Sequence, residues 1–125
     1  MKEIVNSPNA PAPIGPYSQS VKANGFLFVS GQIPLDPDTG QLISGSIAEE
    51  TSQVMKNLDA VLSEAGTSWE NVVKCSIFIR DMNDFASINE VYSEYFPKNP
   101  PARETVEVSQ LPKGVGVEIS LIAIA

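Results

Sequence analysis

Apolar and polar residues alternate along three stretches of the chain, which is the spacing of β-strands that bury one face. These stretches are Val72–Arg80, Ala102–Val108 and Val115–Ile124. Each is long enough to form a strand of ordinary length. In the first stretch the predicted buried face consists of Val73, Cys75, Ile77 and Ile79.

The first part of the chain is predicted to form a loop and then a hairpin. The segment Asn6–Pro16 contains four prolines, which indicates an extended, polyproline-like loop. Two strand-like runs follow, Tyr17–Lys22 and Phe26–Gln32, and they flank Asn24-Gly25. An Asn-Gly step supplies the positive φ angles of a tight turn, so the two runs are predicted to pair as an antiparallel hairpin.

Two helices are predicted where the spacing of apolar residues changes to three and four. The first begins at Ser46, which forms a capping box with Glu49, and ends at Gly66. The second begins at about Asp84 and is stopped by Pro97. The apolar stripes are Ile47, Val54, Met55, Leu58, Val61, Leu62 and Ala65 in the first helix, and Phe85, Ile88, Val91, Tyr92 and Tyr95 in the second.

The order hairpin, helix, strand, helix, strand, strand is typical of one α+β domain spanning residues 1–125. Two helices can cover only one face of its sheet. We expect Arg103 and Glu118 to lie together on the uncovered face. Such a face also carries apolar residues, and the mixture suits an oligomer interface with polar clefts better than a solvated surface. The other residues of the last strand predicted there are Ser120, Ile122 and Ile124.

Composition narrows the possible chemistry. The chain has 125 residues, 42% of them hydrophobic, and no histidine. Catalysis by Ser-His-Asp or Cys-His groups and zinc binding by histidine are therefore excluded. The single cysteine, Cys75, precludes an internal disulfide and is interpreted as a buried thiol in a reducing compartment. The segment Asp36–Gly40 is interpreted as a turn, because no glutamate closes a calcium loop there, and no metal is expected.

The charge and hydropathy of the chain indicate which classes of partner it can bind. Fifteen acidic residues against eight basic ones give a net charge of −7, which disfavours binding to nucleic acid. The sequence shows neither a signal peptide nor an apolar run long enough to span a membrane. We therefore expect a cytoplasmic protein without a membrane partner.

Arg103 and Glu118 are the main candidates for chemistry. Arg103 follows the rigid Pro100-Pro101 step, which would hold its planar guanidinium where it can bind a carboxylate through two hydrogen bonds. The alternative is an ordinary cross-strand ion pair with Glu107 or Glu118. Glu118 lies between apolar residues, so it is either a general base of raised pKa or an exposed strand residue.

Three other positions have both a functional and a structural interpretation. Tyr17 follows a turn and either presents its hydroxyl to a ligand or packs against the fold. Ser30-Gly31 lies near a strand end, where a missing side chain either lets backbone N–H groups approach a ligand or marks a bulge. Asn89 lies at the margin of the second helix's apolar stripe, as a pocket donor or a solvent-exposed residue.

Taken together, these segments resemble the RidA family, also called YjgF, of reactive imine and enamine deaminases. The resemblance covers nearly the whole chain and consists of short segments in the family's order. The segments are Ala12–Gln19, Phe28–Pro34, Gln53–Leu58, Val72–Cys75, Phe85–Asn89, Pro101–Arg103, Val106–Val108, Leu111–Lys113 and Val117–Ile119.

The resemblance implies a chorismate-mutase-like mixed sheet with two helices on one face, assembled as a homotrimer with a site in each cleft between subunits. It also implies cofactor-free hydrolysis of 2-imino acids and their enamine tautomers, such as 2-aminoacrylate, 2-iminopropanoate and 2-iminobutanoate, to 2-oxo acids and ammonia. Arg103 would hold the substrate carboxylate and Glu118 would activate water. The implied pocket residues are Tyr17, Ser30, Gly31 and Asn89.

One position departs from the family pattern. Many members carry a cysteine two residues after the arginine, where this chain has Thr105. Thiol chemistry is excluded at this position, but the Thr105 hydroxyl stays on the Arg103 side of the strand and is expected to contact substrate. Two other functions stay open: a carboxylate-binding or chaperone-like trimer without turnover, and a ribonuclease-type protein.

Overall fold

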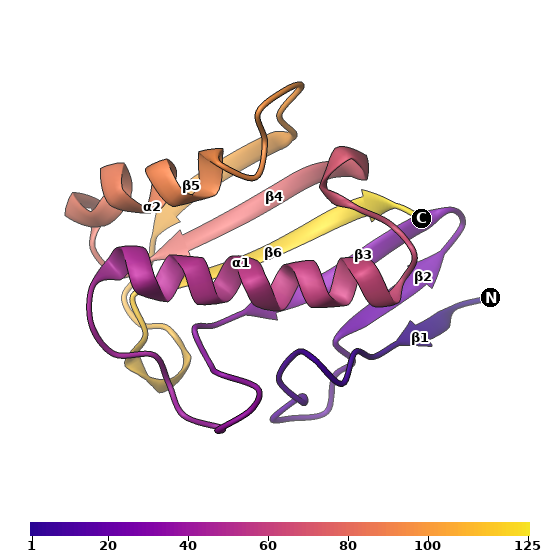
Figure 1. The fold of residues 1–125 in the computed structure, drawn as a ribbon, viewed down its shortest axis with the longest axis horizontal. Helices are drawn as coiled ribbons and strands as arrows, with labels where there is room; N and C mark the ends of the chain where they lie inside the picture. Colours follow the sequence, from indigo (N-terminus) through magenta and orange to yellow (C-terminus); the bar gives the residue numbers. More distant parts are fainter.

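The computed structural model describes residues 1–125 as one mixed sheet with both α-helices on the same side of it (Figure 1). The strand order is β1-β2-β3-β6-β4-β5, and only β4 and β5 run parallel. The expected α+β architecture is confirmed. The strands are β1 (Glu3–Val5), β2 (Ser20–Ala23), β3 (Phe26–Gln32), β4 (Val72–Ile79), β5 (Ala102–Glu107) and β6 (Val117–Ile124).

The predicted hairpin is formed by β2 and β3, which pair antiparallel. Its turn residues Asn24 and Gly25 have φ angles of 51° and 82°, as the Asn-Gly step predicts. β2 begins later than predicted because the side chain of Gln19 is buried and binds the proline-rich loop. Its Nε2 donates to the Pro11 carbonyl at 2.9 Å, and its Oε1 accepts from the Ser7 N–H at 2.6 Å.

β1 adds an edge strand that the sequence pattern did not predict. It pairs antiparallel with β2, from Glu3 opposite Lys22 to Val5 opposite Ser20. Only Val5 of this strand is buried. The Ser20 hydroxyl donates to the Val5 carbonyl at 2.7 Å. A strand of three residues is too short for an alternating pattern to be recognised.

Helix α1 (Ile47–Glu64) begins and ends where the sequence predicts. Ser46 is its N-cap, and its Oγ accepts a hydrogen bond from the Glu49 N–H at 3.2 Å. At the other end Gly66 has a φ of 77°. The Thr67 N–H donates to the Leu62 carbonyl at 3.0 Å, which completes a Schellman motif.

Helix α2 (Phe85–Ser93) is shorter than predicted, with a 3₁₀ turn, Met82–Asp84, before it. Its buried side chains are Ile88 and Tyr92. The helix packs against α1 and connects β4 to β5. Because a helical crossover returns the chain to the same end of the sheet, β4 and β5 can pair in parallel.

The face of the sheet covered by the helices, here called the helix face, carries most of the core. The prediction for Val73 is wrong: it is 38% exposed, whereas Val72 is 5% exposed. The pairing of β4 with β6 shifts between Val72 and Lys74, and this bulge reverses the alternation at the start of β4. The strand residues buried in the core are Val5, Leu27, Val29, Val72, Cys75, Ile77, Ile79, Val117, Ile119, Leu121 and Ala123.

Arg103 and Glu118 lie on opposite faces of the sheet, so the prediction that they share the uncovered face is wrong. Arg103 is the β5 partner of the buried Cys75 on β4 and therefore lies on the helix face. Glu118 pairs with Phe78 on the other face, here called the open face. Alternation shows which residues of one strand share a face. Only the register between strands shows which face of one strand corresponds to which face of the next. On β5, Val106 is accordingly 40% exposed.

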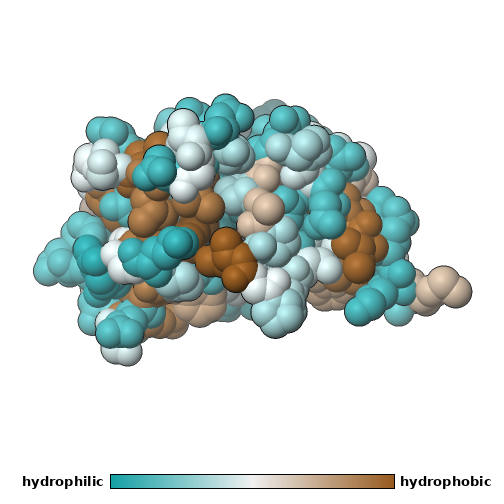
Figure 2. All heavy atoms as spheres, turned by 90° about the horizontal axis from the view of Figure 1, so that it is seen from below, coloured by the Kyte–Doolittle hydropathy of each residue, from teal (hydrophilic) through white to brown (hydrophobic).

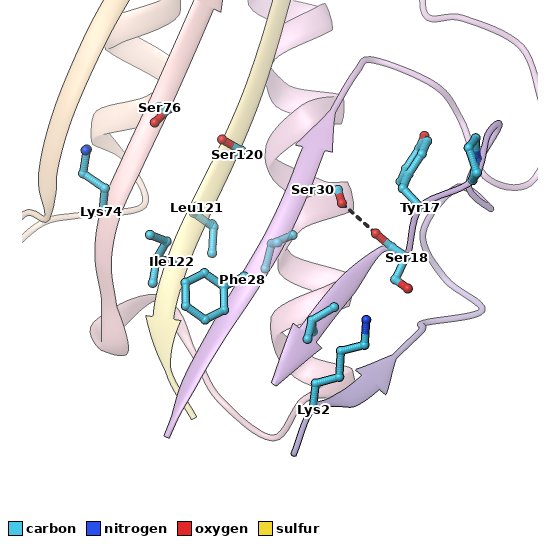
Figure 3. Close-up of a pocket in the computed structure, with 13 residues that line it drawn as sticks. Lys2, Tyr17, Ser18, Phe28, Ser30, Lys74, Ser76, Ser120, Leu121 and Ile122 are labelled. Atoms are coloured by element: carbon cyan, nitrogen blue, oxygen red, sulfur yellow. Dashed lines mark hydrogen bonds between the residues drawn. The ribbon is translucent and has the colours of Figure 1, made fainter. Parts of the chain in front are cut away.

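The open face keeps apolar side chains at the surface. Phe26, Phe28 and Ile124 are 41%, 46% and 51% exposed. Phe28 pairs with the partly buried Ile122 across β3 and β6, so these residues form a continuous apolar area. The mixture of apolar and polar groups predicted for this face is confirmed. Figure 3 shows the polar neighbours Lys74, Ser76 and Ser120.

Seen from below, most of the surface is hydrophilic, and hydrophobic side chains gather in separate patches (Figure 2). Neither α-helix combines the length and the apolar composition required to cross a lipid bilayer.

Candidate functional site

Arg103 lies at the start of β5 with its side chain against α2. Its Nη1 donates a hydrogen bond to Asn89 Oδ1 at 2.8 Å. Its Cζ lies 5.0 Å from the ring centre of Tyr92 and 5.7 Å from that of Phe85. Phe85, Asn89 and Tyr92 are spaced by four and three residues, which places them on one side of the helix. One short helix thus supplies three partners of the guanidinium.

The positive charge of Arg103 has no anionic partner in the chain. The alternative of an ion pair with Glu107 or Glu118 is wrong, because the ion pair of this chain joins Lys74 and Glu104 at 3.0 Å. Glu107 instead accepts a hydrogen bond from the Met82 N–H at 2.7 Å. The amide and the two rings hold the guanidinium without neutralising it, so its positive charge can pair with the carboxylate of a ligand.

Thr105 lies two residues from Arg103 on the same side of β5. Its hydroxyl oxygen is buried and has no hydrogen-bond partner, and the same holds for the Tyr92 hydroxyl. The Tyr92 hydroxyl lies next to the thiol of Cys75. Burial raises the pKa of both Cys75 and Tyr92, so both groups stay protonated at neutral pH. Cys75 is therefore the buried thiol that the sequence predicts.

Glu118 belongs to a second cluster, on the open face of the sheet. Burial within the chain raises its pKa above the ordinary value of a glutamate. A carboxylate in this setting is a stronger base than a solvated one. It lines a hollow of about 320 Å³ together with Ile14, Tyr17, Ser30, Gly31, Ile33 and Pro112.

Gly31 leaves the space that the Glu118 side chain occupies. A Cβ atom at position 31 would collide with the carboxylate and lie 2.8 Å from its Cδ. The pairing of β3 with β6 is also interrupted between Val29 and Gln32, which confirms the bulge considered from the sequence. Gly31 therefore determines where the Glu118 carboxylate lies.

Tyr17 and Ser30 form the other polar side of this hollow. The Tyr17 side chain is 48% exposed, and its Oη accepts a hydrogen bond from the Ile14 N–H at 3.3 Å. The Tyr17 hydroxyl proton therefore remains available to a ligand. The Ser30 Oγ donates to the Ser18 carbonyl at 2.6 Å, as the dashed line in Figure 3 shows. Ser30 can therefore offer a ligand only its oxygen lone pairs.

The predicted site residues, with Phe85 and Tyr92 added by the structure, fall into two groups. We call Phe85, Asn89, Tyr92, Arg103 and Thr105 the arginine cluster, and Tyr17, Ser30, Gly31 and Glu118 the glutamate cluster. The two clusters belong to opposite faces of the sheet, so a single chain does not bring Arg103 and Glu118 to one substrate.

Sequence reasoning missed the role of Phe85 and Tyr92 because aromatic residues at helical spacing were assigned to the core. The signal that indicates their contact with Arg103 is their spacing around Asn89, a polar residue on the same side of α2. Nowhere do three or more His, Cys, Asp or Glu side chains gather closely enough to hold a metal ion. The two clusters offer a fixed cation and a base.

Comparison with known proteins identifies the family. Residues 7–125 match the family described as Endoribonuclease L-PSP. The chain is 54% identical over 123 residues to a RutC family protein of Pyrococcus horikoshii, covering 98% of each chain. It is 44% identical over 124 residues to the human 2-iminobutanoate/2-iminopropanoate deaminase, covering 99% of this chain and 90% of the human one.

Solved structures agree with this match. A crystal structure of a Rid family protein from Yersinia pestis superposes with a TM-score of 0.97 and 50% identity, covering 100% of both chains. Sequence and fold thus agree over nearly the full length of the chain. The chain belongs to the Endoribonuclease L-PSP family, which is the RidA, YjgF or RutC family that its sequence resembles.

Proposed function

We propose that this chain hydrolyses reactive 2-imino acids and their enamine tautomers to 2-oxo acids and ammonia. The observation that carries the proposal is the Arg103 guanidinium, held by Asn89 and two aromatic rings and not paired with any carboxylate. Such a group suits the carboxylate that every 2-imino acid carries. The name of the human relative supports the same class of substrate.

The proposed enzyme is a homotrimer with its sites between subunits. Arg103 and Glu118 lie on opposite faces of the sheet, so both can reach one substrate only if they come from different copies. The exposed Phe26, Phe28 and Ile124 of the open face support contact between copies, because exposed apolar areas often mark interfaces. Arg103 of one subunit would then meet Glu118 of its neighbour.

The chemistry requires orientation and proton transfer. Arg103 holds the carboxylate while the oxygen of a water molecule bonds to the imine carbon. Glu118 takes one proton from that water and passes it to the nitrogen, which gives a carbinolamine. Glu118 then moves the hydroxyl proton of the carbinolamine to its amine. The C–N bond breaks, ammonia is released, and a 2-oxo acid remains. Base assistance of this kind typically contributes about 10²- to 10⁴-fold, in addition to the effect of proximity.

The decisive test uses 2-aminoacrylate, generated in solution by a pyridoxal-phosphate lyase. We expect the protein to accelerate the release of pyruvate and ammonia, and Arg103→Ala to lose most of that acceleration. Arg80→Ala removes the other arginine of the chain and should keep the acceleration. Absence of acceleration with both 2-aminoacrylate and 2-iminobutanoate would overturn the proposal.

Binding without turnover is a separate function, and Glu118 distinguishes it from catalysis. Glu118→Gln removes the base but leaves Arg103 in place, so we expect it to bind pyruvate and to lose hydrolysis. If Glu118→Gln hydrolyses the imine as fast as the wild type, Glu118 is not the base. If the wild type binds pyruvate without hydrolysing imines, the protein is a carboxylate-binding protein without turnover.

RNA cleavage is not proposed, although the family description names an endoribonuclease. The net charge of −7, from eight basic and fifteen acidic residues, repels a phosphate backbone. Incubation of the pure protein with single-stranded RNA tests whether it cleaves RNA. Cleavage that persists in Arg103→Ala and scales with the amount of pure protein would support the nuclease function.

A further inference from the structure

The orientation of Arg103 depends on partners that carry no charge. Its hydrogen bond to Asn89 fixes one nitrogen, Nη1, at 2.8 Å. A single hydrogen bond leaves the guanidinium plane free to rotate about it. The two aromatic rings supply the remaining constraint, because a planar cation is most stable when it lies over the face of a ring. The nearer ring belongs to Tyr92, at 5.0 Å from Cζ.

The Tyr92 side chain is held in place by its surroundings. The residue is 5% exposed, and its ring packs against Phe96 with their centres 4.8 Å apart. Phe85, by contrast, is 37% exposed and lies further from the guanidinium, at 5.7 Å. A buried ring loses rotational freedom when the protein folds, so it can hold a mobile arginine without a further loss of entropy.

The Tyr92 hydroxyl does not contribute to this support. It is buried beside the thiol of Cys75 and makes no hydrogen bond to Arg103. The contact with Arg103 is made by the ring. A phenylalanine at this position would therefore keep the contact, whereas an aliphatic side chain of similar size would remove it.

We propose that Tyr92 is a positioning residue, whose ring sets the plane of the Arg103 guanidinium so that both of its outer nitrogens face the substrate carboxylate. The inference rests on the proposed role of Arg103 in carboxylate binding. It assigns to Tyr92 no contact with the substrate.

The first test reads whether the Tyr92 ring lies over the Arg103 guanidinium, and it needs no substrate. The chain contains two arginines, Arg80 and Arg103, so protein labelled with ¹⁵N-arginine gives two Nε–Hε signals, which Arg80→Lys assigns. A guanidinium over a ring face is shielded, so we expect the Arg103 proton signal upfield of the Arg80 signal. Tyr92→Leu should remove that upfield shift and Tyr92→Phe should keep it.

Matched variants separate positioning from general damage to α2. Tyr95→Leu removes another aromatic residue of the same region, one that packs on Trp69 at 4.9 Å, and should leave the Arg103 signal unchanged. If Tyr92→Leu does not fold, Tyr92→Met places a longer and more adaptable side chain in the same space and carries the same expectation. An Arg103 signal unchanged in a folded Tyr92→Leu or Tyr92→Met protein would overturn the inference.

The second test is kinetic. We expect Tyr92→Leu to raise KM by about 2- to 30-fold with kcat close to that of the wild type, because the cation–π contact holds the group that binds the carboxylate. Tyr92→Phe should restore the wild-type KM. Loss of kcat at an unchanged KM would instead indicate a smaller active fraction and contradict positioning. If the wild type does not hydrolyse imines, the proposed function fails, and the arginine signals still decide whether the Tyr92 ring holds Arg103 by direct contact.

Discussion

The Glu118 carboxyl is partly buried, and burial raises its pKa. The proposed reaction uses the ionised form as a base. Activity should therefore be lost as the pH falls through the raised pKa, and the acid limb of kcat/KM should lie above the ordinary pKa of a glutamate. Steady-state assays between about pH 4 and pH 8 measure this limb. An acid limb that persists unchanged in the residual activity of Glu118→Gln would belong to another group.

The same shift has an opposite consequence for stability. The folded protein holds the Glu118 proton more tightly than the unfolded chain does. The resulting stabilisation is present at low pH and is lost as the pH rises through the raised pKa. We therefore expect Glu118→Gln to unfold at a higher urea concentration than the wild type at pH 7, and the difference to shrink towards pH 4.

The exposed residue Glu90 on α2 provides a matched control for this change. Glu90→Gln should leave the urea midpoint nearly unchanged at both pH values, because surface substitutions usually change stability little. Equal urea midpoints for Glu118→Gln and the wild type at pH 7 would show that burial of the ionised carboxylate carries no penalty.

Gly31 offers a second way to disturb Glu118 without removing it. A Cβ at this position overlaps the carboxylate, so Gly31→Ala should displace the base and lower kcat by up to about 10²-fold, with a smaller effect on KM. Gly15→Ala is the control, since its Cβ would lie 3.5 Å from the Tyr17 ring, an ordinary contact. Unchanged kcat in Gly31→Ala would mean that the bulge yields and that the carboxylate keeps its place.

The sequence identified Arg103, Glu118 and Gly31 but not their relation in space. Alternation along β5 and β6 gives two possible faces for each strand, and the choice depends on the register with β4. Val106, on the side of β5 away from Arg103, is 40% exposed although it is apolar. Tyr92 was recognised as a helix residue that faces inward, yet the contact of its ring with a cation is a tertiary fact that spacing alone does not reveal.

Helix α1 is the element that the sequence specifies best, since its cap and its end are both local signals. Ser46→Ala removes the acceptor for the Glu49 N–H and should lower the free energy of unfolding by about 1 kcal/mol. Ser63→Ala makes the same chemical change at an exposed position of the last turn and should be nearly neutral. Urea midpoints at one protein concentration compare the two variants. Equal effects would mean that the cap contributes nothing.

Elements that depend on distant partners were predicted less well. β1 exists because β2 offers an edge to pair with, and its three residues carry no recognisable pattern. Val73 lies on the exposed face because the pairing of β4 with β6 contains a bulge. Both errors come from interactions across the sheet, whereas the signals that located α1 lie within one segment of chain.

At the scale of the whole molecule, the two clusters are each incomplete. The arginine cluster offers a cation without a base, and the glutamate cluster offers a base without a cation. Association of copies through the apolar open face would complete both at once. The same association would bury the exposed rings of Phe26 and Phe28, so stability and activity would depend on one contact.

Mixed oligomers test this arrangement. Arg103→Ala and Glu118→Gln should each be nearly inactive alone. When the two are refolded together in equal amounts, a neighbouring pair combines an intact Arg103 from one chain with an intact Glu118 from the other in about a quarter of the sites. We expect about a quarter of the wild-type activity to return. The same variants refolded separately and then assayed together, before subunits exchange, should stay inactive. If co-refolding restores no activity, the two residues do not act across a subunit boundary, and the trimeric site is wrong.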